Sequence, residues 1–321
     1  MKSTLYTFSY VKIQLCAFLL LPLTGVAVSI DTVFVGDAGN ANDSTGYGKV
    51  DYEYRIGKYE VTNSQFIDFL HAKAQTDDYD LYNEKMGTHQ NGGITRTGDN
   101  GSYTYSLKPD MGNKPLTNAT YWTALRFANW LTNGGQVDSD TEDGMYTLTT
   151  EGISNNTFTR NSDAWENEGV AITSEDEWYK AAYYKGGSLD AGYWDYAHQS
   201  DSITTDDANY GNPGGPLTDV GSYQKAGAYG TFDQSGNVSE FTEAISIYSG
   251  QRIHRGGSMS SSPTSLRPTT RYSIDTNAVY NNMGFRITSL GVVPEPSTSA
   301  LIFGCLALSV TIINRRRCRT L

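Results

Sequence analysis

The segment GTFDQSGNVSEF, residues 230–241, says more about the fold than any other stretch of this chain. Its two carboxylates, Asp233 and Glu240, lie on either side of a glycine at position 236. Glycine lets the backbone turn so that carbonyl oxygens point inward, and the segment can then gather several hard oxygen donors. Calcium takes donors of this kind. The residues alone leave two interpretations open: a calcium site, or an Asx turn followed by a solvated glutamate.

Two helices upstream are predicted from capping boxes. In VTNSQFIDFLHAKA, residues 61–74, a threonine is followed by a glutamine at the capping-box spacing. TSEDEWYKAAYYKGG, residues 173–187, repeats this spacing with Ser174 and Glu177. Acidic residues in its first turn complement the helix dipole, and we expect this helix to end at Gly186–Gly187.

A third helix is predicted in NATYWTALRFANWLTNGG, residues 118–135. It begins after Thr120, ends at Gly134–Gly135, and is apolar on nearly all sides, so we expect it to be largely buried. The tryptophans of the three helices are expected in the core rather than on a ligand surface. They are Trp122, Trp130 and Trp178.

The rest of the chain is rich in turns. Glycine occurs 33 times and charged residues make up only 18%, which favours a loop-rich fold over a helical bundle. Short alternating segments at 103–107 and 145–149 predict small hairpins, and residues 202–219 are expected to form a long irregular loop. With no repeat and no internal linker, we predict one domain over residues 30–290.

The first residues of the chain are typical of an export signal. Lys2 and Lys12 precede the apolar run LCAFLLLPL, and small residues at alternate positions follow up to Ser29. We therefore predict a signal peptide over residues 1–29, with an uncleaved membrane anchor as the alternative.

Residues 291–321 combine a Pro-Glu-Pro motif at 294–296, an apolar run to Ile313 and an arginine cluster. By the positive-inside rule the arginines stay cytoplasmic and the domain lies outside. The order of these parts resembles the PEP-CTERM sorting signal of exported bacterial proteins. That resemblance implies an exosortase-type partner and a final location at the cell surface, outer envelope or extracellular matrix. A plain C-terminal transmembrane helix is the alternative.

Charge and cysteine content restrict the function further. The whole chain carries a formal net charge of −11, and the basic residues of the two ends leave the domain between them more acidic still. Such a domain is a poor partner for nucleic acid and a suitable one for cations. All three cysteines lie in the ends, so the domain has no disulfide, no thiolate metal site and no cysteine nucleophile. They are Cys16, Cys305 and Cys318.

Six motifs follow one another along the domain. They are YRIGKYEVTNSQFIDFL (54–70), NWLTNGG (129–135), TSEDEWYKAAYYKGG (173–187), GTFDQSGNVSEF (230–241), HRGGSM (254–259) and NMGFRI (282–287). This order resembles the formylglycine-generating enzyme family, also called the sulfatase-modifying factor family, and is most similar to its cysteine-free branch with PEP-CTERM tails. The resemblance implies an α+β fold, a loop-rich variation on the C-type lectin fold.

The resemblance also implies calcium as a cofactor. At the matching positions the family binds calcium through the side chains of Asp233 and Glu240 and through the carbonyl groups of Gly236 and Val238. The residues on either side of the glutamate are a serine and a phenylalanine here, where the family usually has tryptophans. This departure alters the packing rather than the ligands.

A second calcium site is implied in the preceding loop. It would use Asn209 and the carbonyl of Tyr210, with Asn212 and Gly214 as further candidates. The loop departs more strongly from the family pattern than the first segment does.

The residues at the family's copper site differ from those of its oxidases. Those enzymes bind copper through two cysteines shortly after a Gly-Gly-Ser turn, and Ser261 and Leu266 stand at these positions here. Cu(I) requires soft donors, a serine hydroxyl is hard and leucine has no donor, so no copper is expected. Other members bind iron through three histidines, but the histidines of this domain show no such spacing. They are His71, His89, His198 and His254.

Three arginines match arginines of the family, Arg255, Arg271 and Arg286. In a loop-built domain a guanidinium is suited to tying carbonyl and carboxylate oxygens together, so we expect mainly structural roles. The alternative is that Arg255 and Arg271 line a polar pocket with Ser258 and Ser261, and bind an anionic group or a peptide there.

We therefore expect an exported, calcium-stabilised module that is not catalytic and that binds a protein or polysaccharide of the cell envelope. The first alternative is an iron- or copper-dependent oxidase of the same fold acting through residues that the sequence does not identify. The second is the formylglycine-generating oxidoreductase activity itself. No catalytic residue is assigned.

Overall fold

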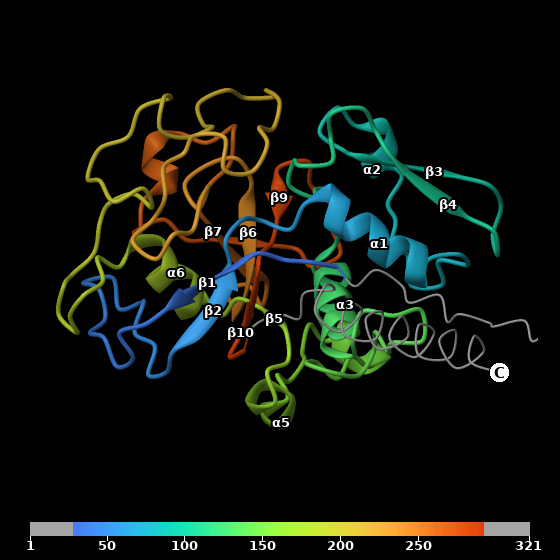
Figure 1. Cartoon of the computed structure of the whole chain (residues 1–321), viewed down its shortest axis with the longest axis horizontal. Helices are drawn as coiled ribbons and strands as arrows, with labels where there is room; N and C mark the ends of the chain where they lie inside the picture. Colours follow the sequence, from blue (N-terminus) through green and yellow to red (C-terminus); the bar gives the residue numbers. More distant parts are fainter. Residues whose placement is uncertain (1–27, 292–321) are drawn as a thin grey trace, which may run out of the picture.

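The computed structural model of the chain describes residues 28–291 (Figure 1). The segments predicted as a signal peptide and as a sorting tail therefore lie almost wholly outside the described residues. Among the residues that are described, no helix is long and apolar enough to cross a membrane.

Two four-stranded sheets and a separate hairpin form the β part of the domain. The first sheet is antiparallel and has the order β1 (Thr32–Val35), β2 (Tyr54–Gly57), β10 (Ile287–Ser289), β5 (Ala171–Ile172). The second has the order β8 (Tyr272–Ile274), β7 (Arg252–Arg255), β6 (Ser239–Ile245), β9 (Met283–Gly284), and β9 pairs with β6 in parallel. The hairpin consists of β3 (Ile94–Thr97) and β4 (Thr104–Leu107).

Short helices connect these strands. They are α1 (Asn63–Lys73), α2 (Lys85–Thr88), α3 (Tyr121–Thr132), α4 (Thr150–Ser154), α5 (Ser162–Glu166), α6 (Glu175–Tyr183) and the 3-10 helix η1 (Pro263–Leu266). Long irregular loops fill the remaining sequence, and Figure 1 shows them gathered on the side of the molecule opposite the β3–β4 hairpin. The predicted class, α+β with little regular secondary structure, is confirmed.

The three predicted helices are present as α1, α3 and α6. At the start of α1, Thr62 Oγ1 accepts from the Gln65 N–H and Gln65 Oε1 accepts from the Thr62 N–H, so the capping box is complete. The same exchange joins Ser174 and Glu177 at the start of α6. The predicted end of α6 was wrong by a few residues, because Tyr184 is already extended.

The predictions for the loops had mixed outcomes. Residues 104–107 form β4 as predicted, and residues 202–219 contain no helix or strand. The hairpin predicted at 145–149 was wrong: Tyr146 makes a single bridge to Arg160, and Thr149 caps α4 instead of extending a strand. Threonine is a good strand residue, but its hydroxyl also makes it a good N-cap.

The main core lies where α1 packs against α3. Phe66 and Phe69 of α1 contact Phe127 of α3, and Phe69 also contacts Trp130, with ring centroids 5.2 to 5.7 Å apart. The three tryptophans expected in the core are all buried, Trp122 and Trp130 in this core and Trp178 in a separate cluster. Offset and edge-to-face contacts at these distances stabilise a core beyond the area that they bury.

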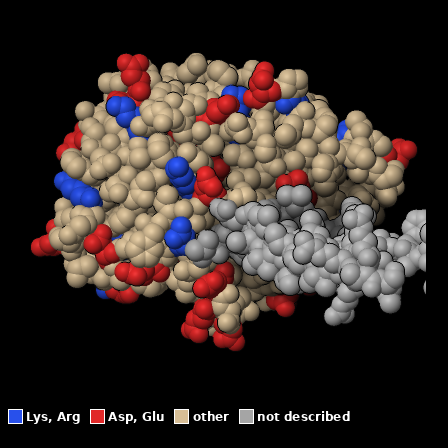
Figure 2. All heavy atoms as spheres, viewed as in Figure 1, with Lys and Arg blue, Asp and Glu red and all other residues tan. Residues whose placement is uncertain are grey.

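Charged side chains are sparse on the surface. On the face shown in Figure 2, acidic side chains are spread around the edge, and basic ones occur singly rather than as a patch.

Candidate functional site

The turn at Gly236 brings together the two segments implied in calcium binding. Gly236 has φ +96°, and an added Cβ would lie 2.4 Å from the Asn209 carbonyl oxygen, so only glycine fits. The next residue, Asn237, donates its backbone N–H to the same carbonyl over 2.8 Å. The loop at 209 and the segment 230–241 are therefore neighbours, although the sequence separates them.

Glu240 is fully buried in an ion pair. Arg286 Nε lies 2.6 Å from Glu240 Oε2 and Nη2 lies 2.7 Å from Oε1, and the Trp178 indole N–H donates to Oε2 over 2.7 Å. The other donors of Arg286 bind the carbonyl oxygens of Gly57 and Phe232. This single guanidinium thus ties strand β2, the 230–241 segment and the end of the domain together, as expected of a structural arginine.

Asp233 lies on the other side of the turn and has fewer partners. Its Oδ2 accepts from the Gly221 N–H over 2.5 Å, and burial raises the pKa of Asp233 to about 6. Beside it is Glu60, which is 1% exposed. One Glu60 oxygen accepts from Asn237 Nδ2, and the other has no hydrogen-bond partner.

Glu60 is a residue that the sequence analysis missed. Burial, together with the nearby Asp233, raises the pKa of Glu60 well above its ordinary value. The sequence does not single Glu60 out, because the motif YRIGKYEVTNSQFIDFL contains a second acid, Asp68, and the burial of Glu60 depends on distant parts of the fold. Three carboxylates and one guanidinium thus share this part of the interior.

The donors in this region fit calcium only in part. Glu240 is already neutralised by Arg286, which leaves Asp233 and the backbone carbonyls of Gly236 and Val238 from the implied set. Within residues 28–291, no group of three or more histidine, cysteine, aspartate or glutamate side chains is arranged to hold a metal ion. Calcium binding at this position stays a prediction.

The loop after the Gly-Gly turn lines a separate cavity of about 430 Å³. Its walls carry six serines and two tyrosines. The serines are Ser239, Ser258, Ser260, Ser261, Ser265 and Ser273, and the tyrosines are Tyr272 and Tyr280. We call this space the serine cavity.

The two positions of the family's copper ligands belong to this loop. Ser261 Oγ accepts from the Ser258 N–H over 2.9 Å and shapes the turn. Leu266 is fully buried, and its carbonyl oxygen accepts from the Tyr183 hydroxyl over 2.8 Å. Neither side chain supplies the soft donor that Cu(I) requires, so these residues do not fit copper.

Arg255 and Arg271 do not line the serine cavity. Both pair with Glu175, the first residue of α6: Arg255 Nε lies 2.8 Å from Oε1, and Arg271 Nη2 lies 2.9 Å from Oε2. From the sequence, Glu175 is expected only to complement the helix dipole, as one of the acids in the first turn of α6. Because this buried carboxylate can accept from two guanidinium groups, it draws both arginines away from Ser258 and Ser261.

His254 forms one wall of the serine cavity. Its ring stacks on Tyr272 with centroids 5.7 Å apart, and its Nδ1 is buried without a hydrogen-bond partner. Burial lowers the pKa of His254 to about 4, so the ring is uncharged at neutral pH. The cavity is consequently polar but carries no positive charge of its own.

Comparison with known proteins identifies the family. Residues 38–289 match the family described as Sulfatase-modifying factor enzyme 1-like domain. The chain belongs to this family. No curated protein is a significant match to the sequence.

Solved structures are similar to this sulfatase-modifying factor domain as well. The match to the crystal structure of CarF covers 82% of this chain and 99% of CarF, with 23% identity and a TM-score of 0.55. Variable protein 1 of Treponema denticola is 20% identical, and the match covers 83% of this chain and 94% of that protein, with a TM-score of 0.49. PvdO from Pseudomonas aeruginosa is 14% identical, and the match covers 82% of this chain and 92% of that protein, with a TM-score of 0.44. At 23% identity, the likeness to CarF shows the fold alone.

Proposed function

We propose that this protein is a binding module of the cell surface or extracellular matrix that is not catalytic and that holds an envelope protein or polysaccharide in the serine cavity. One observation carries the proposal: the residues at the positions of the copper thiolates are a serine fixed in a turn and a buried leucine. The cavity wall carries hydroxyl groups, the amide of Asn282 and a neutral imidazole, beside the apolar side chains of Ile274 and Met283. Such groups bind a ligand by hydrogen bonding and apolar contact.

The cavity favours an uncharged polar ligand. Ser260 and Ser265 are partly open to solvent, and Tyr272 is 48% exposed, so its ring offers an apolar face beside hydroxyl donors. The neutral His254 ring behind it adds no charge that would select an anion. The two arginines that could have done so are committed to Glu175.

Export and surface attachment are part of the same proposal. The basic and apolar order of residues 1–29, and the motif, apolar run and arginines of residues 291–321, support a path through the membrane followed by sorting by an exosortase. Calcium bound near Asp233 would stabilise the domain outside the cell, where the ion is abundant.

Binding to fractions of the native envelope tests the proposal. The mature protein, purified from its host, is incubated with envelope polysaccharide and with envelope protein, and Tyr272→Ala should reduce retention on one of them by about tenfold or more. Tyr248→Ala is the matched control, because Tyr248 is 93% exposed and lies outside the cavity.

The same preparation tests the alternative activity. Supplied with Cu(I), oxygen and a peptide containing Cys-x-Pro-x-Arg, the protein should make no formylglycine above the uncatalysed background. Formylglycine detected by mass spectrometry, or envelope binding that Tyr272→Ala leaves unchanged, would overturn the proposal.

A further inference from the structure

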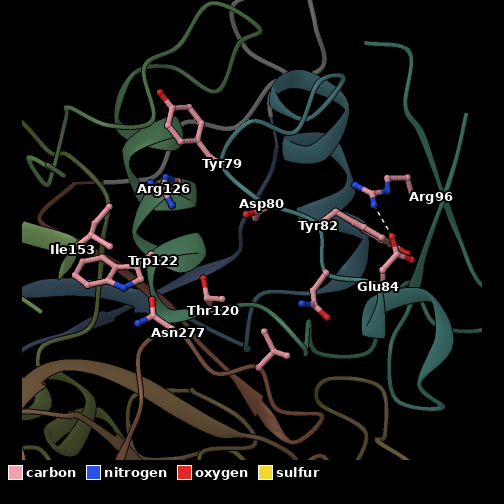
Figure 3. Close-up of a pocket in the computed structure, with 12 residues that line it drawn as sticks. Tyr79, Asp80, Tyr82, Glu84, Arg96, Thr120, Trp122, Arg126, Ile153 and Asn277 are labelled. Carbon is pink, nitrogen blue, oxygen red and sulfur yellow. Dashed lines mark hydrogen bonds and ion pairs between the residues drawn. The ribbon is translucent and has the colours of Figure 1, made fainter. Parts of the chain in front are cut away.

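A second cavity shares no lining residue with the serine cavity, although Val279 of the one is followed directly by Tyr280 of the other. It has a volume of about 560 Å³, within the range of roughly 300 to 1,000 Å³ that is usual for small-ligand sites. The loop before α2, strand β3, the first half of α3 and the loop at 277–279 form its walls (Figure 3). None of the six family motifs discussed above accounts for this hollow.

Trp122 gives this cavity an unused hydrogen-bond donor. The side chain is only 3% exposed, and its indole N–H has no partner among the described residues. Figure 3 shows the nitrogen-bearing edge of the ring on the side of Thr120 and Asn277, which also line the cavity. A buried donor without an acceptor costs free energy, which a ligand oxygen bound to it would recover.

The charges around the cavity are already balanced. Arg126 makes a two-pronged ion pair with Glu142, with distances of 2.6 and 2.9 Å. Arg96 lies 2.5 Å from Glu84 and 3.1 Å from Asp77. Because each guanidinium already has its carboxylate, the cavity has no unpaired positive charge to attract an anion.

Asp80 shifts this balance further against an anion. Its exposed carboxylate also lines the cavity, where it can accept hydrogen bonds from hydroxyl groups. Asn277, on the opposite wall, supplies both a donor and an acceptor. A ligand that satisfies both walls must itself present donors and acceptors.

An aromatic ring stands at the rim. Tyr79 is 47% exposed, and the Arg126 guanidinium lies 4.8 Å from the centre of its ring. Figure 3 shows Tyr79 next to Arg126 at the end of the cavity away from Asn277. Since the guanidinium supports the ring on one side, the tyrosine is a ready platform for an apolar ligand face.

We propose that this cavity binds a neutral saccharide. A sugar ring offers C–H groups on one face, which suit Tyr79, and hydroxyl groups around its edge, which can donate to Asp80 and accept from Trp122. It carries no charge that would disturb the two ion pairs. The site is independent of the serine cavity, and the protein thereby gains a second point of attachment.

Titration with defined sugars tests this site on the mature protein purified from its host. The probes are an array of neutral oligosaccharides built from hexoses, deoxyhexoses, pentoses and N-acetylhexosamines, with oligogalacturonate as the acidic comparison. At least one neutral oligosaccharide should bind, and the indole N–H resonance of Trp122 should shift on binding. The resonance is assigned by its loss in Trp122→Phe, which keeps an aromatic ring but removes the donor.

Variants separate this cavity from the serine cavity. Tyr79→Ala and Trp122→Phe should each weaken binding of the neutral oligosaccharide by about tenfold or more. Tyr272→Ala and Tyr248→Ala should leave binding of the neutral oligosaccharide at this cavity unchanged. The serine-cavity proposal fails separately, if Tyr272→Ala retains its binding to the envelope fractions.

Three results would overturn the assignment. The first is no binding by any neutral saccharide of the array. The second is binding that leaves the Trp122 resonance unmoved, and the third is tighter binding of oligogalacturonate or of a peptide at this site. The resonance is read on the unaltered protein, and if Trp122→Phe does not fold, sequential backbone and side-chain assignment of the unaltered protein identifies it instead.

Discussion

The 230–241 segment is one family motif and the serine-rich loop 258–266 begins at the end of another, yet the two are built in opposite ways. In the first, Glu240 is completely buried and every oxygen of its carboxylate is hydrogen-bonded. In the second, hydroxyl groups are partly open and a neutral histidine faces them. The first region holds the domain together, whereas the second leaves polar groups open to solvent.

The largest effect is expected from breaking the buried pair. Arg286→Leu leaves the Glu240 carboxylate without its cation, and removing one partner of such a pair typically destabilises by about 3 to 5 kcal/mol. The free energy of unfolding in urea measures this loss. Arg271→Leu is the control, because Glu175 keeps Arg255 as a partner. Equal losses in the two variants would contradict the comparison.

Calcium should stabilise the first region by a somewhat smaller amount. At a hundred to a thousand times the dissociation constant, a bound ion contributes roughly 3 to 4 kcal/mol. A chelator should therefore lower the melting temperature of the native protein but not that of Asp233→Asn. Asp190→Asn, in an exposed turn, should behave like the native protein. If Asp233→Asn responds to the chelator as the native protein does, the site assignment fails.

The accuracy of the sequence analysis differed between the two regions for a physical reason. Capping boxes, apolar stripes and turn glycines are local signals, so α1, α3, α6 and the turn at Gly236 could be predicted. Partners of buried charges are long-range, and nothing near Glu240 in the sequence points to Arg286. For the same reason the pairing of Arg255 and Arg271 with Glu175 was missed, as were the orphan oxygen of Glu60 and the cavity beside Trp122.

A pH-dependent effect should also separate the two regions, at about 1.4 kcal/mol per pH unit for each group that titrates. The pKa of Glu60 and that of Asp233 are both raised in the folded protein, so folding binds protons between about pH 4 and 6. Their contribution to stability is fully present below the ordinary carboxyl pKa and is lost as the pH rises through the folded pKa. Unfolding in urea with chelator present should show this slope.

Substitution identifies the groups responsible. Glu60→Gln should flatten the slope and make the domain more stable than the native protein at pH 7, because it removes a carboxylate that is costly to ionise. His254→Asn serves as the comparison, since the pKa of His254 is lowered to about 4 and it stays neutral over most of this window. An unchanged slope in Glu60→Gln would show that other carboxylates cause it.

The smallest effect on stability is expected in the serine cavity. Ser260 and Tyr272 are partly or largely exposed, and surface changes away from caps and ion pairs usually alter the free energy of unfolding by less than about 0.5 kcal/mol. Ser260→Ala and Tyr272→Ala should therefore unfold at nearly the same urea concentration as the native protein, while Tyr272→Ala loses its envelope ligand. A large loss of stability in either variant would mean that this loop supports the fold as the 230–241 segment does, and its open hydroxyl groups would then have to be explained by packing rather than by a ligand.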